Sequence, residues 1–182
     1  MEKEMTTQTK TTRKFQYDRT IGRFSLTDIG FVNPVDIALG NNGEFYVISR
    51  TNKVQGYGTR VTWCDIDQEF HGEFGTMGTE DGEFTWPLGI AVGPDAKVFV
   101  ADEWLQRISV FSREGEFLGK WGSKGSGEGE FNGPSGLAFD AEDNLLVADG
   151  GNHRIQKFTQ DGKPVASFGR LGSGDGEFNY PW

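Results

Sequence analysis

Cysteine and histidine are scarce in this chain of 182 residues, which has one cysteine, Cys64, and two histidines, His71 and His153. A single cysteine excludes an intramolecular disulfide, and nothing in the cysteine content indicates an oxidising compartment. The two histidines stand far apart in the sequence, which does not favour a histidine-based metal site or a catalytic triad. We therefore predict no metal site, no cofactor and no catalytic residues, and we leave open whether the chain belongs to an enzyme.

Long apolar runs are also missing. The first residues, MEKEMTTQTKTTRK, lack the apolar core of a signal peptide, and no segment approaches the length of a membrane span. Residues 1–14 contain almost nothing that could be buried, so we expect a flexible tail there. The sequence as written predicts a soluble, cytoplasmic protein with no membrane partner.

Positive charge is in deficit as well. The chain carries 18 Lys and Arg against 27 Asp and Glu, a net charge of -9. Affinity for nucleic acids comes mainly from basic groups that neutralise phosphates. A nucleic acid is therefore an unfavoured partner, although a local basic patch would be compatible with the total.

An internal repeat organises what is present. The string GEFNGPSGLAFDAEDNLLVADGGNHR at 129–154 follows a close copy, GEFTWPLGIAVGPDAKVFVADEWLQR, at 82–107. A third copy begins at Phe31 and the start of a fourth, GEFNYPW, ends the chain; the prolines at 34, 87, 134 and 181 are spaced by 53, 47 and 47 residues. A period in this range is typical of propellers, solenoids and arrays.

Each full unit contains four short extended runs separated by turn residues, as in LGIAV, KVFVA, RISVF and EFLGKW of the second copy. Four strands per unit is the number in a propeller blade. We therefore predict an all-β fold with three antiparallel blades at about 31–75, 84–122 and 131–169, and one extra strand at 15–22. The apolar second strands and the more polar fourth strands predict that burial falls from the first strand to the last.

Residues that recur in every unit are expected to serve the fold. The recurring aromatic positions Phe84, Phe131 and Phe178 are expected to pack between blades. Gly89 and Gly136 recur where backbones should approach each other. The pairs Asp102–Arg107 and Asp149–Arg154 are expected to satisfy loop N–H and carbonyl groups, whereas the first copy has Ser49 and Arg60 there.

The acidic, glycine-rich loops GTEDGEF, GSGEGEF and GSGDGEF could suggest calcium binding. They lack the alternating oxygen ligands of an EF-hand and recur in every unit, so we interpret them as turns between blades.

The recurring series GEF, P-x-G-[IL]-A-[VF], V-A-D and N-x-R-I, and above all NHRIQKF at 152–158, resembles the NHL repeat. The resemblance covers residues 15–182 and implies a β-propeller, usually six-bladed, whose first strands line a central channel. Proteins of this family include substrate-binding domains of ubiquitin ligases, sensor domains, RNA-binding domains and a metal-dependent amidating lyase.

Six units at this period require about 280 residues, so the chain corresponds to about half of a six-bladed ring. A partial chain is the simplest interpretation, and a homodimer of half-rings is the alternative. In either case we expect exposed blade faces that could self-associate.

Function is expected where the copies differ on one face. In a four-stranded blade, the loop that leads into the first strand and the loop between the second and third strands lie at the same end. We call this end the loop face. Its lead-in loops supply Asn33, Leu88, Asn132, Ser135 and Tyr180 among others, and the first copy has a basic insertion, RTNKVQGYGTR, in its other loop. The candidate binding residues are Asp36, Arg50, Lys53, Tyr57, Arg60, Trp86, Glu103, Trp104, Asn152 and His153.

These observations favour a non-catalytic binding or scaffold module that presents the loop face to a protein, a peptide or a small ligand. One alternative is a fragment of a propeller hydrolase or lyase with a metal in the channel. A second alternative is an RNA-binding domain, which the acidic composition disfavours.

Overall fold

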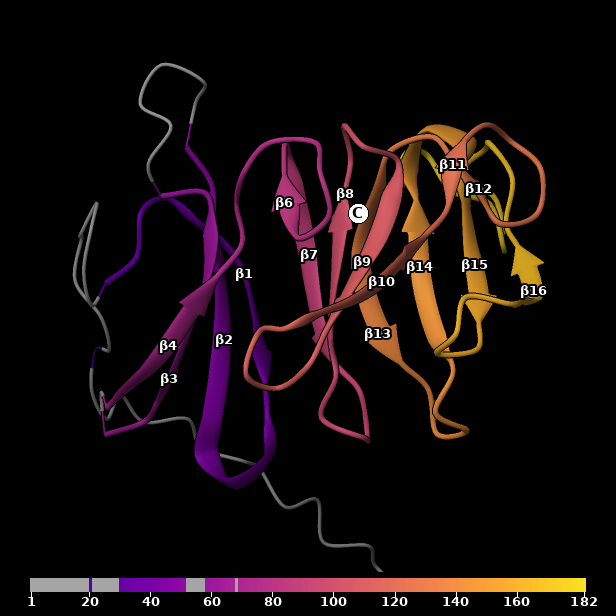
Figure 1. Cartoon of the computed structure of the whole chain (residues 1–182). Helices are drawn as coiled ribbons and strands as arrows, with labels where there is room; N and C mark the ends of the chain where they lie inside the picture. The colour runs from indigo at the N-terminus through magenta and orange to yellow at the C-terminus, as the bar shows by residue number, and fades with distance from the viewer. Residues whose placement is uncertain (1–19, 21–29, 52–57, 68) are drawn as a thin grey trace, which may run out of the picture.

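Three four-stranded antiparallel sheets stand side by side in the computed structural model, which describes residues 20, 30–51, 58–67 and 69–182 (Figure 1). This arrangement confirms the predicted all-β fold and its blades. The predicted tail at 1–14 and the lone strand at 15–22 lie outside the described residues, apart from Thr20.

Each blade is a simple meander in which every strand pairs with the next one in sequence. The first blade contains β1 (Pro34–Leu39), β2 (Glu44–Ser49), β3 (Arg60–Asp65) and β4 (Phe70–Phe74). The second contains β7 (Pro87–Val92), β8 (Val98–Asp102), β9 (Arg107–Phe111) and β10 (Phe117–Trp121), and the third contains β13 (Pro134–Phe139), β14 (Leu145–Asp149), β15 (Arg154–Phe158) and β16 (Pro164–Phe168).

Short elements connect the blades. The two-residue strands β5 (Thr76–Met77) and β6 (Glu83–Phe84) pair in parallel, as do β11 (Ser123–Lys124) and β12 (Glu130–Phe131). The helical elements of the described chain are single 3-10 turns, η1 (Asn41–Gly43) and η2 (Gly150–Asn152), and none is long or apolar enough to span a membrane.

The hairpin turns follow from their residues. Ala96 and Asp143, in the turns between the first two strands, have φ of 64° and 62°, while Gly115 and Gly162, before the last strands, have φ of 89° and 80°. A left-handed backbone at one turn position lets the chain reverse between paired strands; glycine adopts it at low cost, aspartate more readily than most residues, and Ala96 at a cost of about 1 kcal/mol. Pro164 opens β16, an edge strand that pairs with β15 among the described strands, where a residue without a backbone N–H is tolerated.

The hydrophobic core lies between the blades rather than inside one sheet. One cluster joins the first blade to the second through Tyr46, Ile48, Phe84, Val100 and Phe111, among others. A second cluster joins the second blade to the third through Phe99, Ile108, Phe131, Val147 and Phe158, among others. Blades are therefore held by their neighbours, as expected for a repeat architecture.

The predicted fall of burial from first strand to last holds for the fourth strands, which are partly or largely exposed, but was wrong for the first and middle strands. The middle strands β8 and β9 are buried throughout, whereas the first strand of the first blade is largely exposed, with Leu39 78% accessible. The first strands β1, β7 and β13 lie next to one another. The second blade packs against a described blade on each side, and its first strand β7 is mostly buried as well.

Two of the three recurring aromatic residues pack between blades as predicted, whereas Phe178, after the third blade, is only partly buried. Phe84 and Phe131 are fully buried, and each ring lies over the glycine that ends the preceding blade, Gly75 or Gly122. A Cβ atom at these glycines would come within 2.1 Å and 2.6 Å of the two rings. Any side chain at these two glycines would therefore clash with the aromatic ring that the glycine faces.

The acidic loops between blades are turns, as predicted. A carboxylate from the GEF motif accepts a backbone N–H from within its own loop in every copy: Glu83 from Glu80, Glu130 from Gly127 and Glu177 from Gly174. The hydrogen bond from Gly174 is also the main cause that lowers the pKa of Glu177. These glutamates therefore close the turns themselves.

Gly89 and Gly136 occupy equivalent positions but differ in the space around them. Substitution of each glycine therefore tests how closely the first strands pack. A Cβ atom at Gly89 would lie 2.0 Å from the carbonyl oxygen of Ser135, in the neighbouring first strand, whereas the nearest atom at Gly136 would be 3.2 Å away. We expect Gly89→Ala to lower the free energy of unfolding by about 2 kcal/mol, and Gly136→Ala to lower it by less than about 1 kcal/mol, as measured by urea denaturation. Equal losses for the two variants would show that the first strands do not pack this closely.

Candidate functional site

Asp102 ties together the two loops of the second blade at the loop face. Its buried carboxylate accepts N–H groups from Thr85 at 2.7 Å and Trp86 at 3.0 Å, in the loop that leads into β7. It also accepts N–H groups from Trp104 at 3.0 Å and Leu105 at 2.9 Å, in the loop between β8 and β9. Asp102 therefore serves the fold, as predicted, and fixes the backbone of two exposed tryptophans.

The third blade repeats this arrangement with different partners. Asp149 accepts the N–H of Asn132 at 2.7 Å and the Nε of Arg154 at 2.8 Å. Arg154 and Arg107 in turn donate to carbonyl groups of the loops between blades, including those of Glu130 and Glu83. The structural role predicted for both Asp–Arg pairs is confirmed.

Arg60, in the first blade, is buried and fully engaged in the fold. It is 5% accessible, its Nη2 donates to the carbonyl of Gly30, and its Nε lies 2.8 Å from a carboxylate oxygen of Glu73. Its inclusion among the candidate binding residues is corrected on this basis. The physical reason is that Arg60 donates to a loop carbonyl group, as Arg107 and Arg154 do. It keeps this role although the first blade has Ser49, and not a carboxylate, at the end of its second strand.

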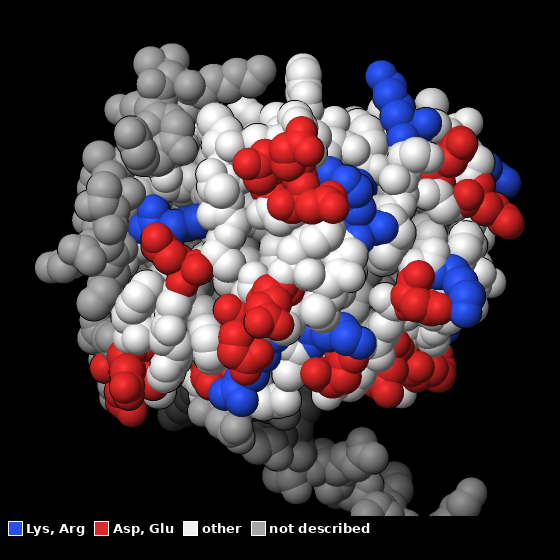
Figure 2. Space-filling model, in the orientation of Figure 1, with Lys and Arg blue, Asp and Glu red and all other residues white. Residues whose placement is uncertain are grey.

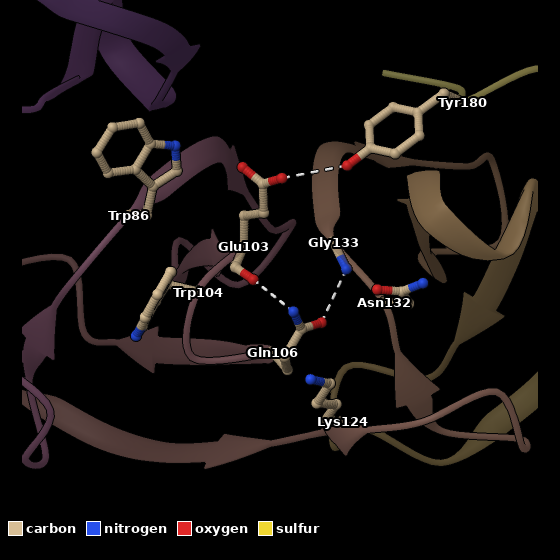
Figure 3. A pocket seen from close by; sticks show the side chains of 8 residues that line it. All are labelled: Trp86, Glu103, Trp104, Gln106, Lys124, Asn132, Gly133 and Tyr180. Carbon is tan, nitrogen blue, oxygen red and sulfur yellow. Dashed lines mark hydrogen bonds between the residues drawn. The ribbon is translucent and has the colours of Figure 1, made fainter.

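A pocket of about 420 Å³ opens between the second and third blades on the loop face (Figure 3). It brings together the predicted residues Trp86, Glu103 and Trp104. The other lining residues are Gln106, Lys124, Asn132, Gly133 and Tyr180. Three exposed aromatic side chains thus surround one carboxylate, with Trp86 41% and Trp104 67% accessible.

Hydrogen bonds hold the floor and one wall of this pocket. Gln106 donates through Nε2 to the carbonyl of Glu103 at 2.7 Å and accepts through Oε1 from the N–H of Gly133 at 2.8 Å (Figure 3). Tyr180 donates its hydroxyl to Glu103 Oε1 at 3.2 Å. Burial, with a further contribution from the Glu103 charge, raises the pKa of Tyr180, so its hydroxyl stays protonated at neutral pH.

Arg50 stacks on the outer wall of the pocket. Its guanidinium carbon lies 4.0 Å from the centre of the Trp86 ring, a cation–π contact between the first and second blades. Burial lowers the pKa of Arg50, and the charges of Glu103 and Asp102 act against that shift. Arg50 also lines a second cavity of about 530 Å³ near the axis, beside Pro34, Leu88, Leu137 and Trp182.

Asp36 lines this axial cavity, but its carboxylate already has partners. Oδ2 accepts the N–H of Ile90 at 2.9 Å and Oδ1 accepts the N–H of Ile37. The equivalent residues in the other blades are Gly89, which meets Ser135 in the next first strand, and Gly136, which faces Trp182. Asp36 thus bridges β1 to β7, and the structure does not bring it to the pocket between the second and third blades.

Asn152 and His153 support the neighbouring loops. Asn152 donates to the carbonyl of Gly125 and to Asp149, both at 2.9 Å. His153 accepts the N–H of Tyr180 through Nδ1 at 3.0 Å, so it helps to place the pocket's tyrosine. Neither lines the pocket that contains Trp86. The other two predicted residues, Lys53 and Tyr57, lie outside the described residues.

Sequence reasoning missed Gln106, Lys124 and Gly133. Gln106 stands where the third copy has His153, and both have a left-handed backbone with φ of 55° and 54°. Lys124 stands where the next copy has Leu171. A comparison of the copies at equal offset would have singled out both positions, because each differs from its counterpart in the third copy.

Charges on the molecule are mixed. Figure 2 shows several separate acidic clusters with basic side chains between them, and no continuous basic band on the face in view. Within 30–51, 58–67 and 69–182, no three His, Cys, Asp or Glu residues gather in a way that could hold a metal ion.

Comparison of this chain with known proteins agrees with the fold. Residues 131–158 match the NHL repeat family. A stretch of 46 residues is 44% identical to B-box type zinc finger protein ncl-1 of Caenorhabditis elegans and 41% identical, over a stretch of the same length, to Protein brain tumor of Drosophila melanogaster. Each stretch covers 25% of this chain but only 5% and 4% of those proteins.

Solved structures show the same architecture. Hydrazine synthase of Kuenenia stuttgartiensis aligns with a TM-score of 0.57 and 20% identity over 86% of this chain and 40% of that one. Virginiamycin B lyase of Staphylococcus aureus aligns with a TM-score of 0.57 and 13% identity over 82% of this chain and 44% of that one. At such identities the likeness concerns the fold alone, and this chain spans less than half of either structure.

Proposed function

We propose that this chain, an NHL-repeat chain with a β-propeller fold, is a non-catalytic binding module that captures a peptide or protein segment on its loop face. The observation that carries the proposal is the pocket between the second and third blades. The backbones of the exposed Trp86 and Trp104 are both held there by hydrogen bonds to the buried carboxylate of Asp102. Fixed, exposed aromatic side chains around a concave site are the usual anchors of protein recognition.

The division between shared and individual residues supports this proposal. Residues common to the blades, such as Phe84 and Phe131, are buried between blades, and Asp102 and Asp149 are buried against loop N–H groups. The pocket, in contrast, is lined by residues with unlike counterparts: Trp86 corresponds to Gly133, and Trp104 to Gly151. Variable loops on a rigid scaffold are how repeat folds acquire specific ligands.

The test is a selection of peptides displayed on phage against the full chain, after which each selected peptide is titrated into the wild-type chain and into the Trp86→Ala/Trp104→Ala double variant. We expect most selected peptides to bind the wild-type chain and to lose at least about tenfold in affinity for the variant. Leu118→Ala, which alters an exposed apolar residue on the outer strand β10, is the control that should leave binding unchanged. Peptides that bind the double variant as well as the wild type would refute this placement of the site.

A further inference from the structure

We infer that the pocket between the second and third blades selects a basic side chain, an arginine or a lysine presented by the partner; this inference rests on the proposed function. The first argument is the composition of its walls. The pocket combines three aromatic rings with the carboxylate of Glu103, which lies between Trp86 and Tyr180 (Figure 3). Aromatic faces attract cations through their quadrupole, and a carboxylate within the same site adds a charge-assisted hydrogen bond.

The second argument is the state of Glu103. Its Oε1 accepts one neutral hydrogen bond, from Tyr180, and it takes part in no ion pair among the described residues. A half-buried carboxylate held by a single tyrosine hydroxyl retains capacity for further donors, since an ionised carboxylate has about four acceptor sites. An incoming guanidinium or ammonium group would supply these donors and a compensating charge.

The third argument is a cation that the chain itself places at this site. Arg50 lies over Trp86 at 4.0 Å, and the charge of Glu103 acts on it favourably. Trp86, which lines the pocket, therefore already contacts one guanidinium in the geometry proposed for the ligand. Tyr180, on the other side of Glu103 from Trp86, offers a second aromatic setting for a cation from outside (Figure 3).

The net charge of the whole chain also favours a basic ligand. With a net charge of -9, the protein attracts a basic segment from a distance and repels an acidic one. Lys124 is the one basic residue that lines the pocket, and it opposes a cationic ligand. The pair Glu103 and Lys124 thus provides two variants whose effects must have opposite sign.

The test uses short capped peptides, Gly-Gly-X-Gly-Gly with X as Arg, Lys or Glu, titrated into the full chain. The signals to follow are the NMR resonances of the Trp86 and Trp104 indole N–H groups, assigned with Trp86→Phe and Trp104→Phe. We expect the Arg and Lys peptides to shift both signals saturably below about 50 mM, the range appropriate to a single side chain, and the Glu peptide to leave them in place. Unmoved Trp63 and Trp121 signals report that each variant is folded.

Variants of the two charged lining residues then test whether the pocket prefers a cation. Glu103→Gln should weaken the Arg peptide about fivefold, and Lys124→Gln should strengthen it about threefold. Glu142→Gln, which removes an exposed acid from the turn between β13 and β14, should change nothing. The inference is overturned if the Glu peptide binds as well as the Arg peptide, if Lys124→Gln weakens binding, or if no peptide shifts the indole signals. In the first two cases the binding module would stand with another ligand chemistry, whereas phage-selected peptides that ignore Trp86 and Trp104 would refute the module itself.

Discussion

Replacement of Asp102 with alanine is expected to lower the free energy of unfolding by about 3 kcal/mol, because four backbone N–H groups lose their acceptor at once. The carboxylate is fully buried, so water does not simply take its place. Urea denaturation followed by circular dichroism measures the loss. The same variant should abolish peptide capture, since the loops that carry Trp86 and Trp104 are joined through this side chain.

Two controls make that prediction specific. Asp102→Asn keeps one carbonyl oxygen and should lose about half as much stability. Asp95→Ala removes an exposed turn carboxylate that pairs with Lys97, and should change stability by less than about 0.5 kcal/mol. If Asp95→Ala were as damaging as Asp102→Ala, acidic residues would matter through net charge and not through the loop N–H groups.

Phe131→Ala is expected to have the largest effect on stability, a loss of about 4 kcal/mol. The ring is fully buried and lies between blades, with its centre 6.0 Å from that of Trp121 and 5.6 Å from that of Phe158. Its removal leaves a cavity that Gly122, the residue beneath it, cannot fill. Differential scanning calorimetry should show a fall in Tm of about 10 °C or more.

Phe168→Ala supplies the comparison for this variant. Phe168 also stands at a recurring aromatic position, the end of the fourth strand, where the other blades have Phe74 and Trp121, but its side chain is about half exposed. We expect a loss below about 1 kcal/mol. Equal effects of the two substitutions would show that packing between blades does not carry the stability of the chain.

The fold was predictable because the sequence contains three copies of the same four-stranded unit. The spacing of Pro34, Pro87 and Pro134 gave the units, and the turn residues gave four strands in each. The burial order was mispredicted because a strand's own composition does not say which neighbours cover it. The second blade packs against a blade on each side and is mostly buried in its first strand β7 too, whereas β1 belongs to a blade with one described neighbour and is largely exposed.

The candidate site was predictable only in part. The end of the blade and the residues Trp86, Glu103 and Trp104 follow from topology and from differences between copies. Arg60 was misplaced because it lies next to the loop insertion, although its side chain turns inward to Gly30 and Glu73. Gln106 and Lys124 were missed because their role depends on the gap between two blades, which no single repeat encodes.

The measurement that tests the account most directly is a map of backbone and indole NMR shifts in the full chain on addition of one phage-selected peptide. The account predicts that the largest changes fall on Trp86, Glu103, Trp104 and Gly133, at the junction of the second and third blades. Changes confined to the outer strands β4, β10 and β16 would contradict it, because those strands would then carry the recognition that we assign to the loops.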